Sequence, residues 1–185
     1  MKSDESLMLD FQRGSQEAFD ELYARYRGPL FGFFSRRLDD LARAEDLVQE
    51  TFVAVIRATA RYEPRSLLRT YLYGIAMNLL RAERRKPAMN EPQEGIEDRG
   101  ADTALEKVLQ VKQALAQLEA GEREILMLRE YEQLEYAEIA ELMRLPINTV
   151  RSRLFRARMS LKEVLGREVP SAARKHQSDR QKVGE

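Results

Sequence analysis

The stretch that decides the fold is YAEIAELMRLPINTVRSRLFRAR, residues 136–158. Its first part has apolar or small side chains at helical spacing, and these are expected to point inward: Tyr136, Ile139, Ala140 and Met143. Arg144-Leu145-Pro146 follows as a short turn, and Pro146 suits the start of a second helix, with Asn148 as another candidate cap. Two helices joined by so short a turn, with small Ala140 where they approach closely, predict a helix-turn-helix.

The second helix of this motif, from near Ile147 through Arg158, separates apolar from basic side chains. A buried face is predicted from residues spaced four, three and four apart: Val150, Leu154, Ala157 and Leu161. The unburied faces carry Thr149, Arg151, Ser152, Arg153, Phe155, Arg156 and Arg158. Arginine pairs with guanine and holds phosphates, so we predict a helix that reads the major groove of DNA. The alternative is a solvated basic face, which the one-sided arginines and the short turn disfavour.

The first 60 residues predict two helices. Helical spacing over 15–38 indicates one, capped by Ser15 and kinked or divided at Gly28-Pro29. The second, over 40–60, has an acidic outer face. Its apolar face is predicted to hold Leu41, Ala44, Leu47, Val48, Phe52, Val55 and Ile56.

A third helix is predicted after the break at 62–66, with Ser66 as its cap. Paired apolar residues at four-residue steps give it a broad buried face: Leu67/Leu68, Tyr71/Leu72, Ile75/Ala76 and Leu79/Leu80. It ends in a basic cluster before Pro87, formed by Arg81, Arg84, Arg85 and Lys86.

The remaining segments complete an all-α chain of two small helical domains. Residues 88–102 are rich in Pro, Gly, Asn and acidic residues and are expected to form a flexible acidic linker. Thr103-Ala104-Leu105-Glu106 fits a capping box, and further helices are predicted over about 121–131, 135–143 and 147–165. The predicted organisation is a first domain over 1–87, the linker, a second domain over 103–165 and a disordered tail over 166–185.

Composition excludes several classes of protein. Lysine and arginine (31) balance aspartate and glutamate (31), so any nucleic-acid contact must come from local basic patches. The chain has no cysteine, so it has no thiol nucleophile and no thiolate metal site. Its one histidine, His176, lies in the predicted tail, and the sequence contains no P-loop. These features disfavour an enzyme. No cofactor or metal is expected. The polar N-terminus and the absence of a long apolar run predict a soluble, cytoplasmic protein without membrane insertion.

The motifs resemble those of bacterial extracytoplasmic-function (ECF) sigma factors of the sigma-70 family. Residues 131–158 resemble region 4 of that family, residues 44–52 (AEDLVQETF) resemble region 2.2, and residues 71–85 (YLYGIAMNLLRAERR) are similar to regions 2.3 and 2.4. The resemblance spans roughly residues 15–165, and the order and spacing of the motifs make it specific. The sequence departs from the family at Met77, Ala82, Arg144 and Asn148.

The resemblance implies a sigma factor that binds core RNA polymerase, at the clamp of the largest subunit and the flap of the second-largest, and directs transcription initiation at promoter DNA. It implies −35 recognition by the exposed set of the second helix, from Thr149 to Arg158, and polymerase binding by Asp46, Gln49 and Glu50. It implies −10 recognition and melting by Ser66, Tyr71, Asn78, Arg81, Arg84 and Arg85. Such proteins have no catalytic site of their own. The family is often held inactive by an anti-sigma factor, to which no residue here points.

The sequence disfavours three other classes of protein. A helix-turn-helix regulator acting without being a polymerase subunit would carry a receiver or ligand-binding lobe, and residues 1–87 show no βαβ pattern. An enzyme is disfavoured because the chain has no cysteine nucleophile and no nucleotide-binding loop. A helical adaptor would not carry two basic helix ends, at 81–86 and 151–158.

Overall fold

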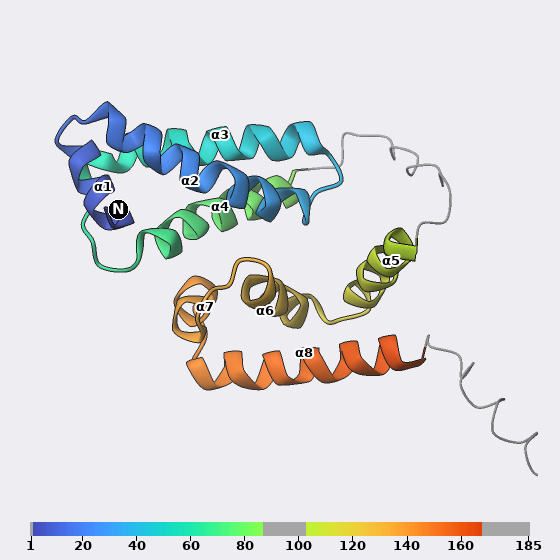
Figure 1. Cartoon of the computed structure of the whole chain (residues 1–185). Coiled ribbons are helices and arrows are strands. Elements are labelled where there is room, and N and C mark those ends of the chain that lie inside the picture. The colour runs from blue at the N-terminus through green and yellow to red at the C-terminus, as the bar shows by residue number, and fades with distance from the viewer. Residues whose placement is uncertain (1, 87–102, 168–185) are drawn as a thin grey trace, which may run out of the picture. The chain divides into compact units, whose positions relative to one another are not determined.

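The computed structural model describes residues 2–86 and 103–167, with the side chains of 103–108 and 166–167 excepted. Within these ranges there is no strand, and the all-α prediction is confirmed (Figure 1). The helices are α1 (Asp4–Gln12), α2 (Gln16–Ser35), α3 (Leu41–Ala58), a 3-10 turn η1 (Thr59–Arg61), α4 (Leu68–Arg84), α5 (Thr103–Ala116), α6 (Ala120–Glu130), α7 (Tyr136–Met143) and α8 (Ile147–Arg167). The predicted linker, most of the predicted tail and the side chains of the Thr103–Glu106 capping box lie outside the described residues. The predicted domain boundaries stay a prediction.

Contacts within the chain define two compact units. The first contains α1 to α4 together with residues 127–147, and therefore α7. The second contains α5, most of α6 and α8.

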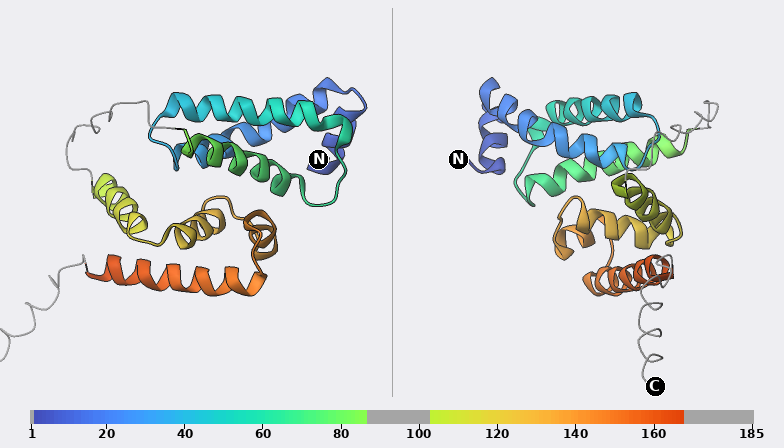
Figure 2. Two further views of the ribbon diagram at one scale, coloured as in Figure 1. Left: turned by 180° about the vertical axis from the view of Figure 1, so that it is seen from behind. Right: turned by 45° about the vertical axis from the view of Figure 1, so that its right-hand side comes forward.

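Helices α2, α3 and α4 lie alongside one another in the first unit, as the two views of Figure 2 show. Ser15 caps α2 as predicted, because its Oγ accepts a hydrogen bond of 3.2 Å from the Ala18 N–H. Of the kink or division predicted at Gly28-Pro29, the division is wrong, since α2 continues through Pro29 to Ser35. Proline removes one backbone hydrogen bond, and the burial of Leu30, Phe33 and Phe34 directly after it holds the helix together.

The core of this bundle is apolar and aromatic. Phe33 of α2 is fully buried, with its ring centroid 5.2 Å from that of Phe34 and 5.5 Å from that of Tyr73. The predicted apolar face of α3 is confirmed at five positions, but Leu41 and Ile56 are exposed because they lie near the two ends of the helix. On α4 the buried stripe is rotated from the predicted pairs and holds Leu68, Leu72, Tyr73, Ala76, Met77 and Leu80, while Leu67 is exposed.

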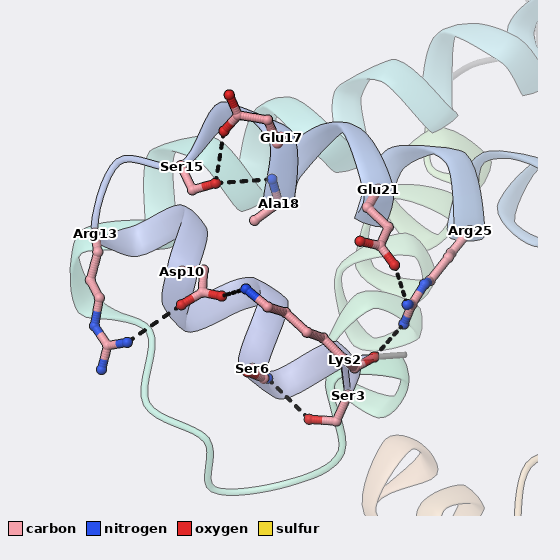
Figure 3. Close-up of polar contacts among 10 residues, drawn as sticks. All are labelled: Lys2, Ser3, Ser6, Asp10, Arg13, Ser15, Glu17, Ala18, Glu21 and Arg25. Carbon is pink, nitrogen blue, oxygen red and sulfur yellow. Dashed lines mark hydrogen bonds and ion pairs between the residues drawn. The ribbon is translucent and has the colours of Figure 1, made fainter.

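Helix α1 forms before the first helix that the spacing predicts, and polar contacts tie it to itself and to α2 (Figure 3). Ser3 caps it by accepting 3.2 Å from the Ser6 N–H, and Lys2 pairs with Asp10 at 2.6 Å. Arg25 of α2 donates to the Lys2 carbonyl at 3.1 Å. These contacts hold α1 in place while its apolar side buries Leu7 and Met8.

Helix α4 receives its cap from α1. The Leu68 N–H donates to Glu5 Oε1 at 3.0 Å, and the N-cap residue Leu67 offers no side-chain bond. The prediction that Ser66 caps this helix is therefore wrong. A carboxylate at a helix N-terminus also complements the helix dipole, so α1 is part of what positions α4.

The turn after α7 places Arg144 at φ 54° and ψ 47°, in the left-handed region that favours glycine. Leu145 N–H donates to the Ala140 carbonyl at 2.9 Å and closes the helix end. Helix α8 then begins at Ile147, directly after Pro146, so Asn148 lies inside its first turn and is not its cap. The predicted turn is confirmed.

We expect Arg144→Gly to be more stable than Arg144→Ala by about 1 kcal/mol. Both variants lose the same side chain, and only alanine keeps the Cβ that makes the left-handed conformation costly. Chemical denaturation of the two variants measures the difference. Equal stability, or a more stable alanine variant, would show that the turn does not hold Arg144 in this conformation.

Candidate nucleic-acid interface

Helix α8 shows the separation of faces that its sequence predicts. Val150, Leu154 and Ala157 are buried, and Leu161 is half-buried. The opposite side leaves exposed Arg151, Ser152, Phe155, Arg156 and Arg158, with Thr149 and Arg153 half-buried. Phe155 is a large apolar side chain that is left 64% exposed on the same side.

Two of the α8 arginines have carboxylate or amide partners within the second unit. Arg156 Nε donates to Glu122 Oε1 of α6 at 2.7 Å. Arg151 Nη1 donates to Asn148 Oδ1 at 3.3 Å, one helical turn earlier. Sequence reasoning missed Glu122, because nothing in the sequence distinguishes it from an ordinary solvated residue of α6. The consequence is that Arg156 is oriented before any ligand arrives, while Arg151 is held only by a neutral amide.

The exposed side of α4 gathers a second set of predicted residues. Asn78, Arg81, Arg84 and Arg85 are exposed, and Ser66 and Tyr71 are half-buried. Four of the six line one pocket of about 270 Å³, namely Ser66, Tyr71, Asn78 and Arg81. Arg84 and Arg85 lie beyond this pocket, at the end of α4 and just after it.

A neighbouring pocket of about 420 Å³ lies at the loop before α4, and Tyr62, Glu63, Arg65, Ser66 and Tyr71 line it together with Ala58 and Arg61. Tyr71 is shared by the two pockets, and its ring lies edge-on to that of Tyr62 with centroids 5.5 Å apart. Burial raises the pKa of the Tyr71 hydroxyl, so the ring stays neutral. A neutral aromatic ring between polar walls is suited to stacking on a nucleobase.

The acidic face of α3 lines a broad groove of about 1030 Å³. The predicted residues Asp46, Gln49 and Glu50 are all exposed and all line this groove. Val53 also lines it and is exposed. Sequence reasoning missed Arg43, which links two helices here. Its guanidinium donates to Glu50 Oε1 at 2.8 Å and to Glu83 Oε2 of α4 at 2.7 Å. Arg43 therefore fixes the wall of the groove.

The hydrogen bond from Arg43, assisted by Lys86, lowers the pKa of Glu83 to about 2. A folded-state pKa below the ordinary 4.5 means that the ionised carboxylate contributes stability above pH 4.5, and that this contribution is lost as pH falls towards about 2.

We expect Glu83→Gln to lower the free energy of unfolding by about 1 kcal/mol at neutral pH. The difference from the unmodified chain should shrink steadily as pH is lowered from 5 towards 2, as urea denaturation at each pH would measure. Glu163→Gln on α8 is the matched control, because Glu163 is exposed and should change little at any pH. A difference that does not depend on pH would contradict the assigned pairing.

Within the described ranges no three His, Cys, Asp or Glu side chains lie close enough together to hold a metal ion. The same ranges contain no helix with the length and apolar character needed to cross a membrane.

Comparison with known proteins identifies the class. Residues 22–88 match the family model for sigma-70 region 2, and residues 109–161 match that for sigma-70 region 4. RNA polymerase sigma-H factor of Pseudomonas aeruginosa is 34% identical over 182 residues, covering 89% of this chain and 94% of that protein. ECF RNA polymerase sigma-E factor of Haemophilus influenzae is 33% identical over 176 residues, covering 84% and 92%.

Solved structures agree. The structure of CnrH in complex with the cytosolic domain of CnrY matches with a TM-score of 0.70 at 26% identity, covering 90% of this chain and 99% of that one. The sigma factor RpoE in complex with the anti-sigma factor NepR, from Bartonella quintana, matches with a TM-score of 0.62 at 25% identity, covering 81% and 98%.

Two domain types that occur in sigma-70 factors thus follow one another in this chain. The chain belongs to the sigma-70 family of RNA polymerase sigma factors, in its extracytoplasmic-function subfamily. The alternative of a helix-turn-helix regulator outside the polymerase does not account for the region 2 match.

Proposed function

We propose that this chain directs core RNA polymerase to promoters, with α8 reading the −35 element, α4 reading and opening the −10 element, and α3 binding the polymerase. The observation that carries this division is that each predicted set lies on one solvent-facing surface of one helix or its adjoining loop. The polymerase then performs the chemistry, and the chain supplies recognition.

For the −35 element, α8 offers a row of donors. Arg151 and Ser152 are exposed one after the other, and Arg158 extends the same helix two turns further. A helix that enters the major groove contacts base edges near its N-terminus and phosphates along its flanks. We therefore assign base contacts to Arg151 and Ser152, and phosphate contacts to the later arginines.

For the −10 element, the α4 pockets provide an amide, an aromatic ring and a run of arginines. Asn78 can donate to and accept from the edge of an unpaired base, and Tyr71 can stack on a base face. Arg81, Arg84 and Arg85 continue along the exposed side and can follow the phosphates of a separated strand. The polar loop at 62–66 forms the wall where a displaced base would enter.

For the polymerase, the α3 groove combines carboxylates with exposed apolar surface. Asp46 and Glu50 give it negative charge, and Val53 and Ile56 are exposed beside them on α3. We assign the clamp of the largest subunit as the partner of this groove, and the flap of the second-largest subunit as a partner of the region 4 residues. Because RpoE of Bartonella quintana binds an anti-sigma factor, we propose a partner of the same class for this chain. From the proposed action with core polymerase, we also propose that the chain acts in the cytoplasm.

The test is run-off transcription by core bacterial polymerase with this chain and a panel of promoter fragments. We expect initiation on a subset that shares −35 and −10 sequences. If the chain is folded but no fragment is transcribed with any core polymerase tested, the proposal is overturned. Salt titration of promoter binding adds a second readout, since an adaptor without phosphate contacts would show no steep dependence on salt.

Arg151→Ala is expected to weaken promoter binding by about 1–3 kcal/mol and to relax preference at a single −35 base pair. The reason is that a base contact discriminates among base pairs, whereas a phosphate contact does not. Competition binding of holoenzyme against fragments with each −35 position varied measures this. Equal weakening on every sequence would reassign Arg151 to a phosphate.

A further inference from the structure

We propose that the track for single-stranded DNA does not end at the loop before α4 but continues onto the C-terminal end of α3, where Arg57 and Arg61 bind two further phosphates of the displaced strand. The ligand is the sugar–phosphate backbone of nucleotides beside the −10 element, bound without regard to their sequence. This inference rests on the proposed −10 role of α4, and it adds a contact that this role does not itself require.

Three cavities follow one another along this part of the surface, because neighbouring cavities share lining residues. The cavity on α4 shares Ser66 and Tyr71 with the cavity at the loop. The loop cavity in turn shares Ala58 and Arg61 with the groove on α3. A strand that leaves the loop cavity on the side opposite to the α4 cavity therefore meets the C-terminal end of α3.

The backbone between α3 and α4 is fixed where the strand would cross it (Figure 1). Gln12 Nε2 of α1 donates to the Thr59 carbonyl at 2.8 Å and to the Tyr62 carbonyl at 3.2 Å. The 3-10 turn η1 lies between these two carbonyls and ends at Arg61. Because the backbone on both sides of Arg61 is already ordered, less ordering is needed when its guanidinium binds a phosphate.

Arg57 and Arg61 are available for phosphate binding. Both are exposed, and they lie about one helical turn apart, about 6 Å along the axis. Their neighbour Arg65 is paired with Glu63 at 2.6 Å. Within the part of the chain that the structure describes, neither Arg57 nor Arg61 has an ion pair of this kind. Arginine forms charge-assisted, often bidentate hydrogen bonds with phosphate, so each of the two can take one phosphate.

The sign of the charge changes along the α3 groove, and this change sets where the strand leaves it. Arg57 and Arg61 line one half of the groove, and Asp46 and Glu50 line the other. Glu50 and Arg57 are about 10 Å apart along the helix, roughly a Debye length at physiological salt, so the two halves attract and repel nearly independently. Phosphates are held by the basic half and repelled by the acidic half, which stays available to the polymerase.

Two other roles could place arginines here. Arg57 lies in the last turn of α3, where a cation complements the helix dipole and can be otherwise solvated. Alternatively, both arginines could contact the polymerase together with the acidic half of the groove. The first role affects only stability and the second only the affinity for core polymerase. Neither role changes the binding of single-stranded DNA by the chain alone, so this binding distinguishes them from the proposal.

Arg57→Gln with Arg61→Gln is expected to lower the salt dependence of single-stranded DNA binding by the full chain. Each phosphate contact contributes about 0.7 to the slope of log K against log salt, so two lost contacts lower the slope by about 1.4. Anisotropy titrations with a labelled oligothymidylate that spans all three cavities measure the slope without polymerase. Arg13→Gln with Arg27→Gln is the control, because it removes the same charge from other exposed positions and should leave the slope nearly unchanged.

A crosslinker on the groove locates the strand directly. The chain has no cysteine, so Ala60→Cys or Gln49→Cys provides a single thiol for a short photoactivated crosslinker. Both positions are exposed and line the groove, Ala60 beside the two arginines and Gln49 in the acidic half. We expect the oligothymidylate to crosslink at Ala60→Cys and not at Gln49→Cys. The Ala60→Cys crosslink should weaken when Arg57 and Arg61 are replaced by glutamine.

Equal slopes for the two double variants would overturn the proposal, and so would crosslinking at Gln49→Cys as strong as at Ala60→Cys. A parent chain that binds no single strand at low salt would do the same. If Arg57→Gln with Arg61→Gln weakens binding to core polymerase and leaves the slope unchanged, the polymerase is the occupant and the proposal fails. Circular dichroism confirms that each variant folds. Loss of run-off initiation by the parent chain, with the expected change in slope, would bear on the proposed function alone.

Discussion

Leu30→Ala is expected to lower the free energy of unfolding of the α1–α4 unit by about 2–5 kcal/mol. Leu30 is fully buried in α2, directly after Pro29. Truncation leaves a cavity and removes one of the contacts that keep the helix continuous past the missing backbone hydrogen bond. Because domains are stable by only about 5–15 kcal/mol, much of the unit would be unfolded at moderate temperature.

Leu41→Ala is the matched control, because the same side chain is removed from the start of α3 where Leu41 is 59% exposed. It should change stability by less than about 0.5 kcal/mol. Urea denaturation followed by far-ultraviolet circular dichroism compares the two. Similar losses for both variants would contradict the assigned core.

Replacing Arg81, Arg84 and Arg85 together with glutamine is expected to reduce the salt dependence of single-stranded DNA binding. Each phosphate contact to a single strand contributes about 0.7 to the slope of log K against log salt, so three lost contacts lower it by about 2. Anisotropy titrations with a labelled single-stranded oligonucleotide over a range of salt give the slope. The effect on affinity is largest at low salt and fades as salt is raised.

The control removes three charges elsewhere, through Arg13→Gln, Arg27→Gln and Lys162→Gln, all at exposed positions. Both triple variants have the same net charge. If the control lowers the slope as much as the α4 variant does, the attraction is a property of total charge, and the assignment of these three arginines to the −10 strand fails.

The helices could be predicted from the sequence because each is an amphipathic segment with local stop signals. The 3.6-residue period predicted the buried face of α8, and Ser15 and Pro146 predicted where α2 and α8 begin. Errors arose where a distant segment decides the outcome. Glu5 caps α4 in place of Ser66, and packing carries α2 through Pro29.

The candidate site could also be predicted from the helical period, except where contacts with distant segments decide which residues belong to it. Exposed residues on one face, such as Arg151 on α8 and Asn78 on α4, follow from the helical period. Arg43 and Glu122 were missed, because the sequence alone does not distinguish a paired charged residue on a helix from a solvated one. Their partners Glu83 and Arg156 lie on other helices, and no local pattern connects them.

The bond between Glu5 and the Leu68 N–H has a consequence for synthesis of the chain on the ribosome. The N-terminal helix emerges first, but the helix that it caps is completed only after more than sixty further residues have been added. Closing a loop of this length costs chain entropy that only the assembled bundle recovers. The proposed −10 surface therefore takes its final form late, after α2 and α3 have joined α1, and a nascent chain that stops short of α4 carries an acidic α1 with nothing to cap.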